Sequence, residues 1–99
     1  MHIQVRLMPW FSELLSPEHT STVLVDEELQ PGSTVRSLIR ALASRSPRLG
    51  DALYSSEQDT LRHVVVVTCN GCLVSSAEAL DMVLQEGDRF VFAPVYSGG

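Results

Sequence analysis

The sequence PGSTVRSLIRALASRSP, residues 31–47, decides the fold of this chain. Its first four residues are typical of a turn that ends on a helix N-cap, because a Ser or Thr hydroxyl satisfies free N–H groups of the first turn. Pro47 would end the helix. The apolar residues recur at i, i+3, i+4 and i+7 and form one stripe, made of Val35, Leu38, Ile39 and Leu42. This stripe predicts one amphipathic helix that packs against another layer.

The residues before the helix predict two strands that can pair with each other. Ile3, Val5 and Leu7 alternate with polar residues, which is the period-2 pattern of a half-buried strand. Pro9 ends this strand, and residues 10–15 have the spacing of a short helical turn. Residues 21–26 read as the second strand.

The residues after the helix predict three further strands. Residues 49–62 read as a short helical turn and a polar loop. The aliphatic run 64–68 does not alternate, which is expected of a strand covered on both faces. Asn70-Gly71 is a strong signal for a type I′ hairpin, and a further helical turn is suggested around residues 80–84.

The last predicted strand covers residues 89–93 and follows a reversal at Gly87-Asp88. Pro94 cannot donate to a ladder, so strand pairing should fade there and leave residues 95–99 projecting. We therefore expect an α+β fold, with a mixed sheet of about five strands packed on one main helix. Residues 1–94 would form the domain and residues 95–99 a flexible tail.

Size and composition fit one ordinary globular domain. The chain has 99 residues, of which 44% are hydrophobic and 19% charged. Its longest aliphatic run, Val64 to Val67, is far shorter than the roughly 20 apolar residues of a membrane span. The N-terminus lacks the apolar core of a signal peptide, so we expect a cytoplasmic protein.

The charge of the chain limits the classes of partner that it is expected to bind. A net charge of −5 argues against binding to nucleic acid and would suit a basic partner surface. All seven cationic residues are Arg, so no lysine of this chain can receive an isopeptide bond.

The sequence Ser97-Gly98-Gly99 makes the C-terminal carboxylate a candidate reactive group. Two residues without Cβ atoms give a narrow tail that can thread a tunnel in a partner enzyme. The ionised carboxylate can attack an activated phosphate such as the α-phosphate of ATP. The two glycines could equally be an ordinary frayed end.

The chain offers one rival site, the C-x-x-C pair formed by Cys69 and Cys72. A zinc site would need further ligands, and the chain has neither a second cysteine pair nor histidines at paired spacing. An iron–sulfur cluster would need four cysteines, and the chain has two. A redox disulfide across the hairpin is geometrically possible, but the pair lies outside the strand-to-helix junction that stabilises a thiolate, and ordinary thiols are the favoured interpretation.

Several segments together resemble the MoaD/ThiS family of sulfur carriers. The C-terminal sequence Leu84-Gln85-Glu86-Gly87-Asp88, followed by an apolar strand, Pro94 and a final Gly-Gly, is similar to the signature of that family. Further matches are residues 34–38 at the helix start, residues 46–49 after it, and Asn70-Gly71 at the hairpin. The resemblance covers nearly the whole chain.

The resemblance implies a ubiquitin-like β-grasp protein that bears sulfur on Gly99. In this family a partner of the ubiquitin-activating type adenylates the terminal glycine with ATP and converts it to a thiocarboxylate. The carrier itself has no bound cofactor, no metal and no catalysis of its own. Ser97 and Gly98 would be the threaded tail, and Phe92 and Pro94 would contact the partner.

The resemblance favours the branch that serves molybdenum cofactor biosynthesis, in which the second partner is the large subunit of molybdopterin synthase. Val95 and Tyr96 depart from the usual pattern of that branch, which has a second proline and an aliphatic residue. Tyr96 could anchor the tail in a partner's slot or lie loosely on the surface. Sulfur delivery to cysteine, thiamine or tRNA, a ubiquitin-like protein modifier, and a plain interaction domain with an inert tail are the alternatives.

Overall fold

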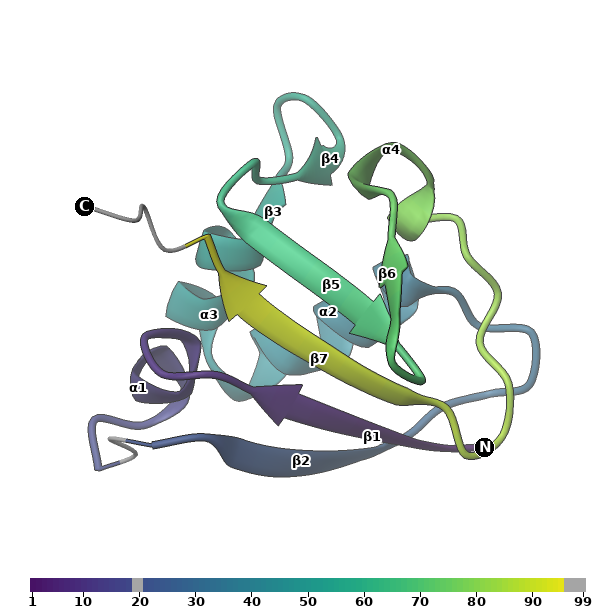
Figure 1. The fold of residues 1–99 in the computed structure, drawn as a ribbon, viewed down its shortest axis with the longest axis horizontal. Helices are drawn as coiled ribbons and strands as arrows, with labels where there is room; N and C mark the ends of the chain where they lie inside the picture. The colour runs from purple at the N-terminus through teal and green to yellow at the C-terminus, as the bar shows by residue number, and fades with distance from the viewer. Residues whose placement is uncertain (19–20, 96–99) are drawn as a thin grey trace.

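A five-stranded mixed sheet is the centre of the computed structural model, which describes residues 1–18 and 21–95 (Figure 1). The spatial order of its strands is β2-β1-β7-β5-β6, with β1 and β7 parallel and the other neighbours antiparallel. The strands span His2–Leu7 (β1), Val23–Glu28 (β2), Val65–Cys69 (β5), Cys72–Val74 (β6) and Arg89–Pro94 (β7).

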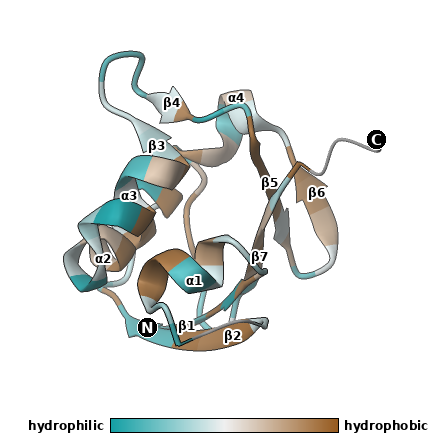
Figure 2. Ribbon diagram, turned by 90° about the vertical axis from the view of Figure 1, so that its left-hand side faces the viewer, coloured by the Kyte–Doolittle hydropathy of each residue, from teal (hydrophilic) through white to brown (hydrophobic). Residues whose placement is uncertain are grey.

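Helices cover one face of this sheet (Figure 2). The main helix α2 packs beside α3, and α1 lies between the ends of β1 and β2. Ile3, Val5, Phe90 and Phe92 of the sheet meet Leu38 and Leu42 of α2 in a single buried core. The helices span Phe11–Leu15 (α1), Val35–Arg45 (α2), Pro47–Leu53 (α3) and Ser76–Ala79 (α4).

The main helix forms as predicted. Thr34 is its N-cap, with an extended backbone and an N–H that donates to Ser37 Oγ at 3.5 Å. All four residues of the predicted stripe are buried. Their burial confirms that the period of the stripe was read correctly.

Pro47 has a role that the sequence analysis did not predict. The helix α2 does end before it, but Pro47 is the first residue of α3, a position that tolerates proline because its missing N–H would have no helical partner. Ser46 joins the two helices, since its N–H donates to Leu42 O and its Oγ accepts from Leu49 N–H at 3.3 Å. The expected turn and loop over 49–62 is thus corrected to α3 and a small antiparallel pair, β3 (Tyr54–Ser55) and β4 (Thr60–Leu61).

The second strand starts and ends two residues later than predicted. Its register pairs Val25 with Val5, and both are buried, while Glu27 also points inward and is 9% exposed. Arg45 of α2 forms an ion pair with Glu27. Because a charged residue occupies a position on the core side, the alternation of apolar and polar residues does not mark the true end of this strand.

The prediction that the aliphatic run 64–68 is covered on both faces is wrong. The strand β5 alternates, with Val65, Val67 and Cys69 buried and Val66 and Thr68 partly exposed. Within residues 1–18 and 21–95, helices pack on only one face of the sheet, and so the second face of β5 stays open (Figure 2). The apolar run reflects partial burial on that open face.

The predicted helical turn around residues 80–84 is also corrected. The short helix α4 ends at Ala79, and Val83 instead forms an isolated antiparallel bridge with Thr34. Leu80 and Leu84 are buried, whereas Val83 is 57% exposed. In the part of the chain that the structure describes, no helix is long and apolar enough to cross a membrane.

Candidate functional site

The strand β7 holds the segment that leads to the predicted reactive end. It lies between β1 and β5 and is hydrogen-bonded on both sides. Pairing reaches one residue beyond the predicted limit, because Val95 N–H donates to Val64 O at 2.7 Å. The chain therefore leaves the sheet from a position that its pairing with β5 fixes.

Pro94 fits this strand because of the direction its nitrogen faces. Phe92 O accepts from Met8 N–H at 3.0 Å, so Phe92 and, two residues on, Pro94 turn their main-chain groups toward β1. The strand β1 has already ended at Leu7. Consequently the missing N–H of Pro94 removes no ladder hydrogen bond.

The residues predicted to contact a partner fall into two groups: two are buried in β7, and the others belong to the end of the chain. The Phe92 side chain is fully buried and stacks on Phe90, with ring centroids 6.4 Å apart. Pro94 is buried at the end of β7. In this structure Phe92 can act on a partner only through its place in the strand. The remaining predicted site residues, Tyr96, Ser97, Gly98 and Gly99, lie outside the described residues.

A polar network fixes the start of β7. Asp88 is 8% exposed, and its carboxylate accepts from Gln85 N–H at 2.9 Å and from the Asn70 side-chain amide at 3.0 Å. Gly87 has a φ of 83°, and its N–H donates to His2 O at 2.9 Å. The Leu-x-x-Gly-Asp sequence is thus a turn held by the carboxylate at its own end.

Asn70 connects this turn to the hairpin between β5 and β6. Its φ of 52° and the φ of 85° at Gly71 confirm the predicted type I′ turn. Its side-chain oxygen accepts from Arg89 N–H at 2.9 Å, and its own N–H donates to Arg89 O at 2.8 Å. The sequence predicts only the turn at Asn70, whereas its second role depends on contacts with residues 18 and 19 positions later.

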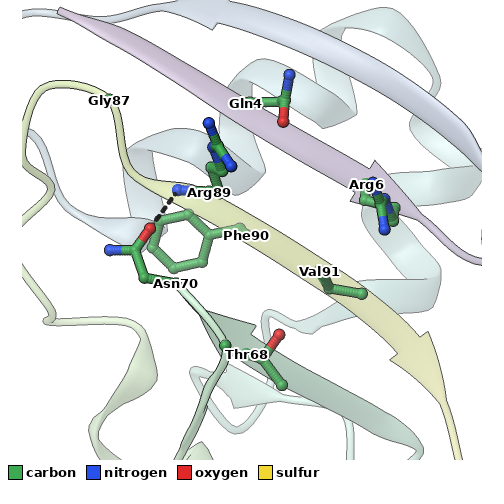
Figure 3. Close-up of a pocket in the computed structure, with 9 residues that line it drawn as sticks. Gln4, Arg6, Thr68, Asn70, Gly87, Arg89, Phe90 and Val91 are labelled. Atoms are coloured by element: carbon green, nitrogen blue, oxygen red, sulfur yellow. Dashed lines mark hydrogen bonds between the residues drawn. The ribbon is translucent and has the colours of Figure 1, made fainter.

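The open face of the sheet carries a shallow depression that sequence reasoning missed (Figure 3). Its volume is about 590 Å³, and it lies over β1, β7 and β5. Figure 3 shows that side chains from all three strands gather there, with the hairpin at one edge. The polar groups at the depression are Gln4, Arg6, Thr68, Asn70 and Arg89. The signal in the sequence is the set of polar residues that alternate with the buried residues along each strand, because these must lie together on the other face of the sheet.

The two cysteines are free thiols. Cys69 is buried, and this burial, followed by the nearby Asp88 and Cys72, raises the pKa of its thiol. Cys72 is exposed. A raised pKa is the opposite of what activates a nucleophilic cysteine, which agrees with the interpretation of the pair as ordinary thiols.

A family model described as the ThiS family matches residues 16–99 of the chain. No curated protein matches it. Among solved structures, SAMP1 from Haloferax volcanii has a TM-score of 0.76 at 22% identity, with 100% of both chains covered. The putative molybdopterin converting factor, subunit 1, from Pyrococcus furiosus has a TM-score of 0.68 at 21% identity and covers 97% of this chain and 99% of that chain.

A chain of the BexX/CysO complex from Amycolatopsis orientalis is similar as well. Its TM-score is 0.68 at 22% identity, covering 96% of this chain and 99% of that chain. These likenesses establish that the fold is the ubiquitin-like β-grasp, as the resemblance implied.

Proposed function

The chain belongs to the ThiS family of ubiquitin-like sulfur carriers, and from this premise we propose that it carries sulfur as a thiocarboxylate on Gly99 for molybdenum cofactor biosynthesis. Proteins of this family are small carriers without catalytic activity of their own. The adenylation would be performed by a partner of the ubiquitin-activating type, which supplies the ATP site. The acceptor partner would be the large subunit of molybdopterin synthase.

One observation carries the proposal, the position of β7 in the middle of the sheet. The strand is paired with β1 up to Phe92 and with β5 up to Val95, which is 55% exposed. Four residues after Val95 the sequence ends at Gly99. A rigid strand that ends four residues before the reactive group sets where a partner finds that group.

The chemistry follows from a carboxylate and an activated phosphate. A carboxylate oxygen of Gly99 would attack the α-phosphate of ATP, with pyrophosphate as the leaving group. A persulfide of a partner would then displace AMP from the acyl-adenylate and form an acyl disulfide. A second thiol of the partner would attack the partner's own sulfur in this acyl disulfide and break the S–S bond. The thiocarboxylate would remain on Gly99, and the two partner sulfurs would form a disulfide. Gly98 leaves the tail narrow enough to enter the partner's site.

The acceptor that receives the sulfur is inferred from the residues near the end of the chain and from one structural neighbour. The sequence Ser97-Gly98-Gly99 and the approach through Asp88 support the molybdopterin branch, and one structural neighbour has a molybdopterin converting factor's name. Val95 and Tyr96 depart from the usual pattern of that branch, and the second candidates are delivery of sulfur to another acceptor and conjugation to proteins. A neighbour described as a small archaeal modifier protein supports conjugation.

Intact-mass analysis of the protein from its native cell tests the function. We expect the intact mass to show replacement of one oxygen by sulfur, and fragmentation to place the change on the peptide that ends at Gly99. Conjugates of high mass would favour the modifier, and an unmodified chain without conjugates would favour an inert domain. Either result would contradict the proposed carrier.

A truncation tests the role of Gly99 directly. We expect a chain without Gly99 to keep the unfolding transition of the wild type and to lose sulfur transfer in a reaction with the activating enzyme, ATP and a persulfide donor. Gly98→Val should also block adenylation, because a β-branched side chain widens the tail. Retained transfer in the truncated chain would overturn the assignment. Addition of the molybdopterin synthase large subunit and a cyclic pyranopterin monophosphate tests the destination.

A further inference from the structure

The two cysteines of the C-x-x-C sequence face each other across the hairpin between β5 and β6. Cys69 is the last residue of β5, Cys72 is the first residue of β6, and the two are partners in the antiparallel register. Residues directly opposite each other in a sheet place their side chains on the same face. Cys69 belongs to the buried core at 6% exposure, whereas Cys72 lies on the edge strand and is exposed. One thiol is therefore shielded from water, and its partner is accessible to an ion from solution.

The hydrogen bonds of β5 fix the spacing of the two thiols. Val95 N–H donates to Val64 O, so the main-chain groups of Val64 face β7. These groups alternate in direction along a strand, and five residues later those of Cys69 face β6. The type I′ turn agrees, because such a turn closes with a hydrogen bond between the residues on either side of it. Cys69 and Cys72 thus form a hydrogen-bonded pair, in which the Cα atoms are about 5.5 Å apart.

This spacing suits a bridging ion better than a disulfide. The Cα spacing alone permits a disulfide, but a disulfide also needs Cβ atoms about 3.5–4.5 Å apart. At a hydrogen-bonded pair the Cβ atoms are about 5.5 Å apart. A thiolate–metal bond is roughly 2.3 Å long in zinc sites, so two such bonds in line hold two sulfur atoms roughly 4.6 Å apart. Rotation about the Cα–Cβ bonds reaches this separation while the backbone stays in place.

The number and type of the ligands select the class of ion. Thiolates are soft ligands that favour soft ions such as Cu(I). A structural zinc ion takes four ligands. Among residues 1–18 and 21–95, no third side chain of His, Cys, Asp or Glu is placed to join the two cysteines around one ion. Cu(I) and Ag(I), by contrast, form stable complexes with two thiolates in line. The pair therefore matches a monovalent soft metal ion.

Negative charge lies close to the hairpin, on the face of the two thiols. The Asp88 carboxylate is 8% exposed and accepts from the side-chain amide of Asn70, the first turn residue, at 3.0 Å. Cys69 is in register with Phe90, two residues after Asp88 and buried on the same face. The cationic side chain of β7, Arg89, belongs to the depression on the opposite, open face (Figure 3). A carboxylate on the side of the thiols favours a cation there.

We propose that Cys69 and Cys72 bind one monovalent soft metal ion, Cu(I) in the cell, as two thiolates across the hairpin. Each thiol loses its proton to water, and each sulfur donates an electron pair to the ion. No electron is transferred, so the ion stays monovalent and no oxidant is needed. The inference goes beyond the proposed function, since no step of sulfur transfer uses either cysteine. The pair also lies at the end of the sheet away from Val95, because Cys69 is in register with Phe90 at the start of β7.

Titration of the full chain with Cu(I) tests the proposal. Reduced protein is titrated in the absence of oxygen, and bicinchoninate competes for the ion and reports the Cu(I) that it captures by its colour. We expect one ion per chain to be withheld from bicinchoninate, with two protons released for each ion bound. X-ray absorption at the copper edge should show two sulfur neighbours.

Two variants separate the position of the thiols from their number. Cys72→Ser removes the exposed thiol and should abolish the binding that resists bicinchoninate. Cys72→Ser/Leu73→Cys is the matched control, which restores a second thiol on the other face, since successive residues of a strand point to opposite faces. Leu73 is 75% exposed, so this thiol should be tolerated, and the control should bind Cu(I) no better than Cys72→Ser. Thermal unfolding checks that both variants are folded.

Several results would overturn the proposal. A wild type that loses all its copper to bicinchoninate has no such site, and tight binding retained in either variant would place the ion elsewhere. One ion shared by a dimer in size-exclusion chromatography would assign it to a contact between two exposed thiols. An intramolecular disulfide formed with hydrogen peroxide, seen as a monomer that has lost two hydrogens, would contradict the spacing. Sulfur transfer to Gly99 should be equal in Cys72→Ser and the wild type, so the carrier function stands or falls separately.

Discussion

At the scale of single residues, Asp88 links two turns by hydrogen bonds, a role that its place in a sequence signature does not reveal. A carboxylate that is 8% exposed satisfies one main-chain N–H and one side-chain amide, and these belong to two different turns. Such charge-assisted hydrogen bonds contribute about 1.5–3 kcal/mol each. The residue thereby holds the start of the strand that leads to Gly99.

We predict that Asp88→Ala lowers the free energy of unfolding by about 1–3 kcal/mol, because it removes the acceptor of two part-buried donors, the Gln85 N–H and the Asn70 side-chain amide. Urea unfolding measures this loss. Asp81→Ala is the control, since Asp81 forms only an exposed pair with Arg36 and such surface pairs contribute little to stability. Equal losses in the two variants would show that the network adds nothing.

Tyr54 gives a second prediction for a single residue. Its hydroxyl donates to Asp59 Oδ1 at 2.6 Å, and this hydrogen bond is the main reason that the pKa of Tyr54 is raised. The same bond, followed by the one from Arg36, lowers the pKa of Asp59. The Tyr54 contribution to stability is therefore complete below the unfolded pKa and is lost as the pH rises through the folded pKa. The Asp59 contribution is present above its unfolded pKa and is lost as the pH falls through its folded value.

We expect the tyrosinate absorbance of Tyr54 to appear above the ordinary pKa of about 10. Asp59→Asn should return it toward that value, because the charged acceptor is gone. The titration is made in a Tyr96→Phe background, so that Tyr54 is the only source of tyrosinate absorbance. Asp81→Asn should leave the Tyr54 titration in place, and an unchanged titration in Asp59→Asn would contradict the assignment.

At the scale of secondary structure, the pair α2 and α3 depends on the absence of one side chain. A Cβ atom at Gly50 of α3 would lie 2.5 Å from the Cβ of Ala43 in α2, far inside normal contact. The sequence around Pro47 permits two helices, but only their close approach explains why residue 50 is glycine.

We predict that Gly50→Ala lowers the free energy of unfolding by about 1–3 kcal/mol through overpacking. Adding Ala43→Gly should recover part of this loss, even though glycine by itself costs a helix about 1 kcal/mol. The two changes are then non-additive in urea unfolding. Ala41→Gly, in the same helix, is the control and should simply add its own cost to that of Gly50→Ala. Simple addition in both pairs would rule out the proposed clash.

The strand β5 shows where a pattern of residues is ambiguous at this scale. Five consecutive residues of its segment, 64–68, are aliphatic or threonine, which the sequence analysis interpreted as burial on both faces. The open face is only partly exposed because neighbouring side chains of β7 and β6 lie beside it. An apolar run therefore indicates that both faces of a strand are at least partly shielded from solvent. It does not show whether a second layer of helices or strands covers the second face.

At the scale of the whole molecule, stability should be highest along the centre of the sheet. The strand β7 is paired with β1 and β5, whereas β3 and β4 form a separate pair of two residues each. Amides that open only with the whole domain exchange slowest, and amides of short edge pairs exchange fastest.

We predict that the Phe90 and Phe92 amides are among the slowest to exchange with deuterated water and that the Ser55 and Thr60 amides are among the fastest. Hydrogen exchange followed by NMR measures both groups in one sample. Adding denaturant should bring the β7 amides to the free energy of global unfolding. Similar protection in the two groups would mean that β3 and β4 are as firmly held as the central strands.

The sequence by itself determined the main helix, the type I′ hairpin, the strand that precedes Gly99 and the family. These features depend on local periods, on turn residues with positive φ, and on short spacings, all of which can be read along the chain. Only the tertiary structure decided that Glu27 points inward to Arg45, that Asn70 joins Asp88, and that Gln4 pairs with Arg89. These pairs join residues 18 to 85 positions apart, and no local pattern records which strands pair or which face the helices cover.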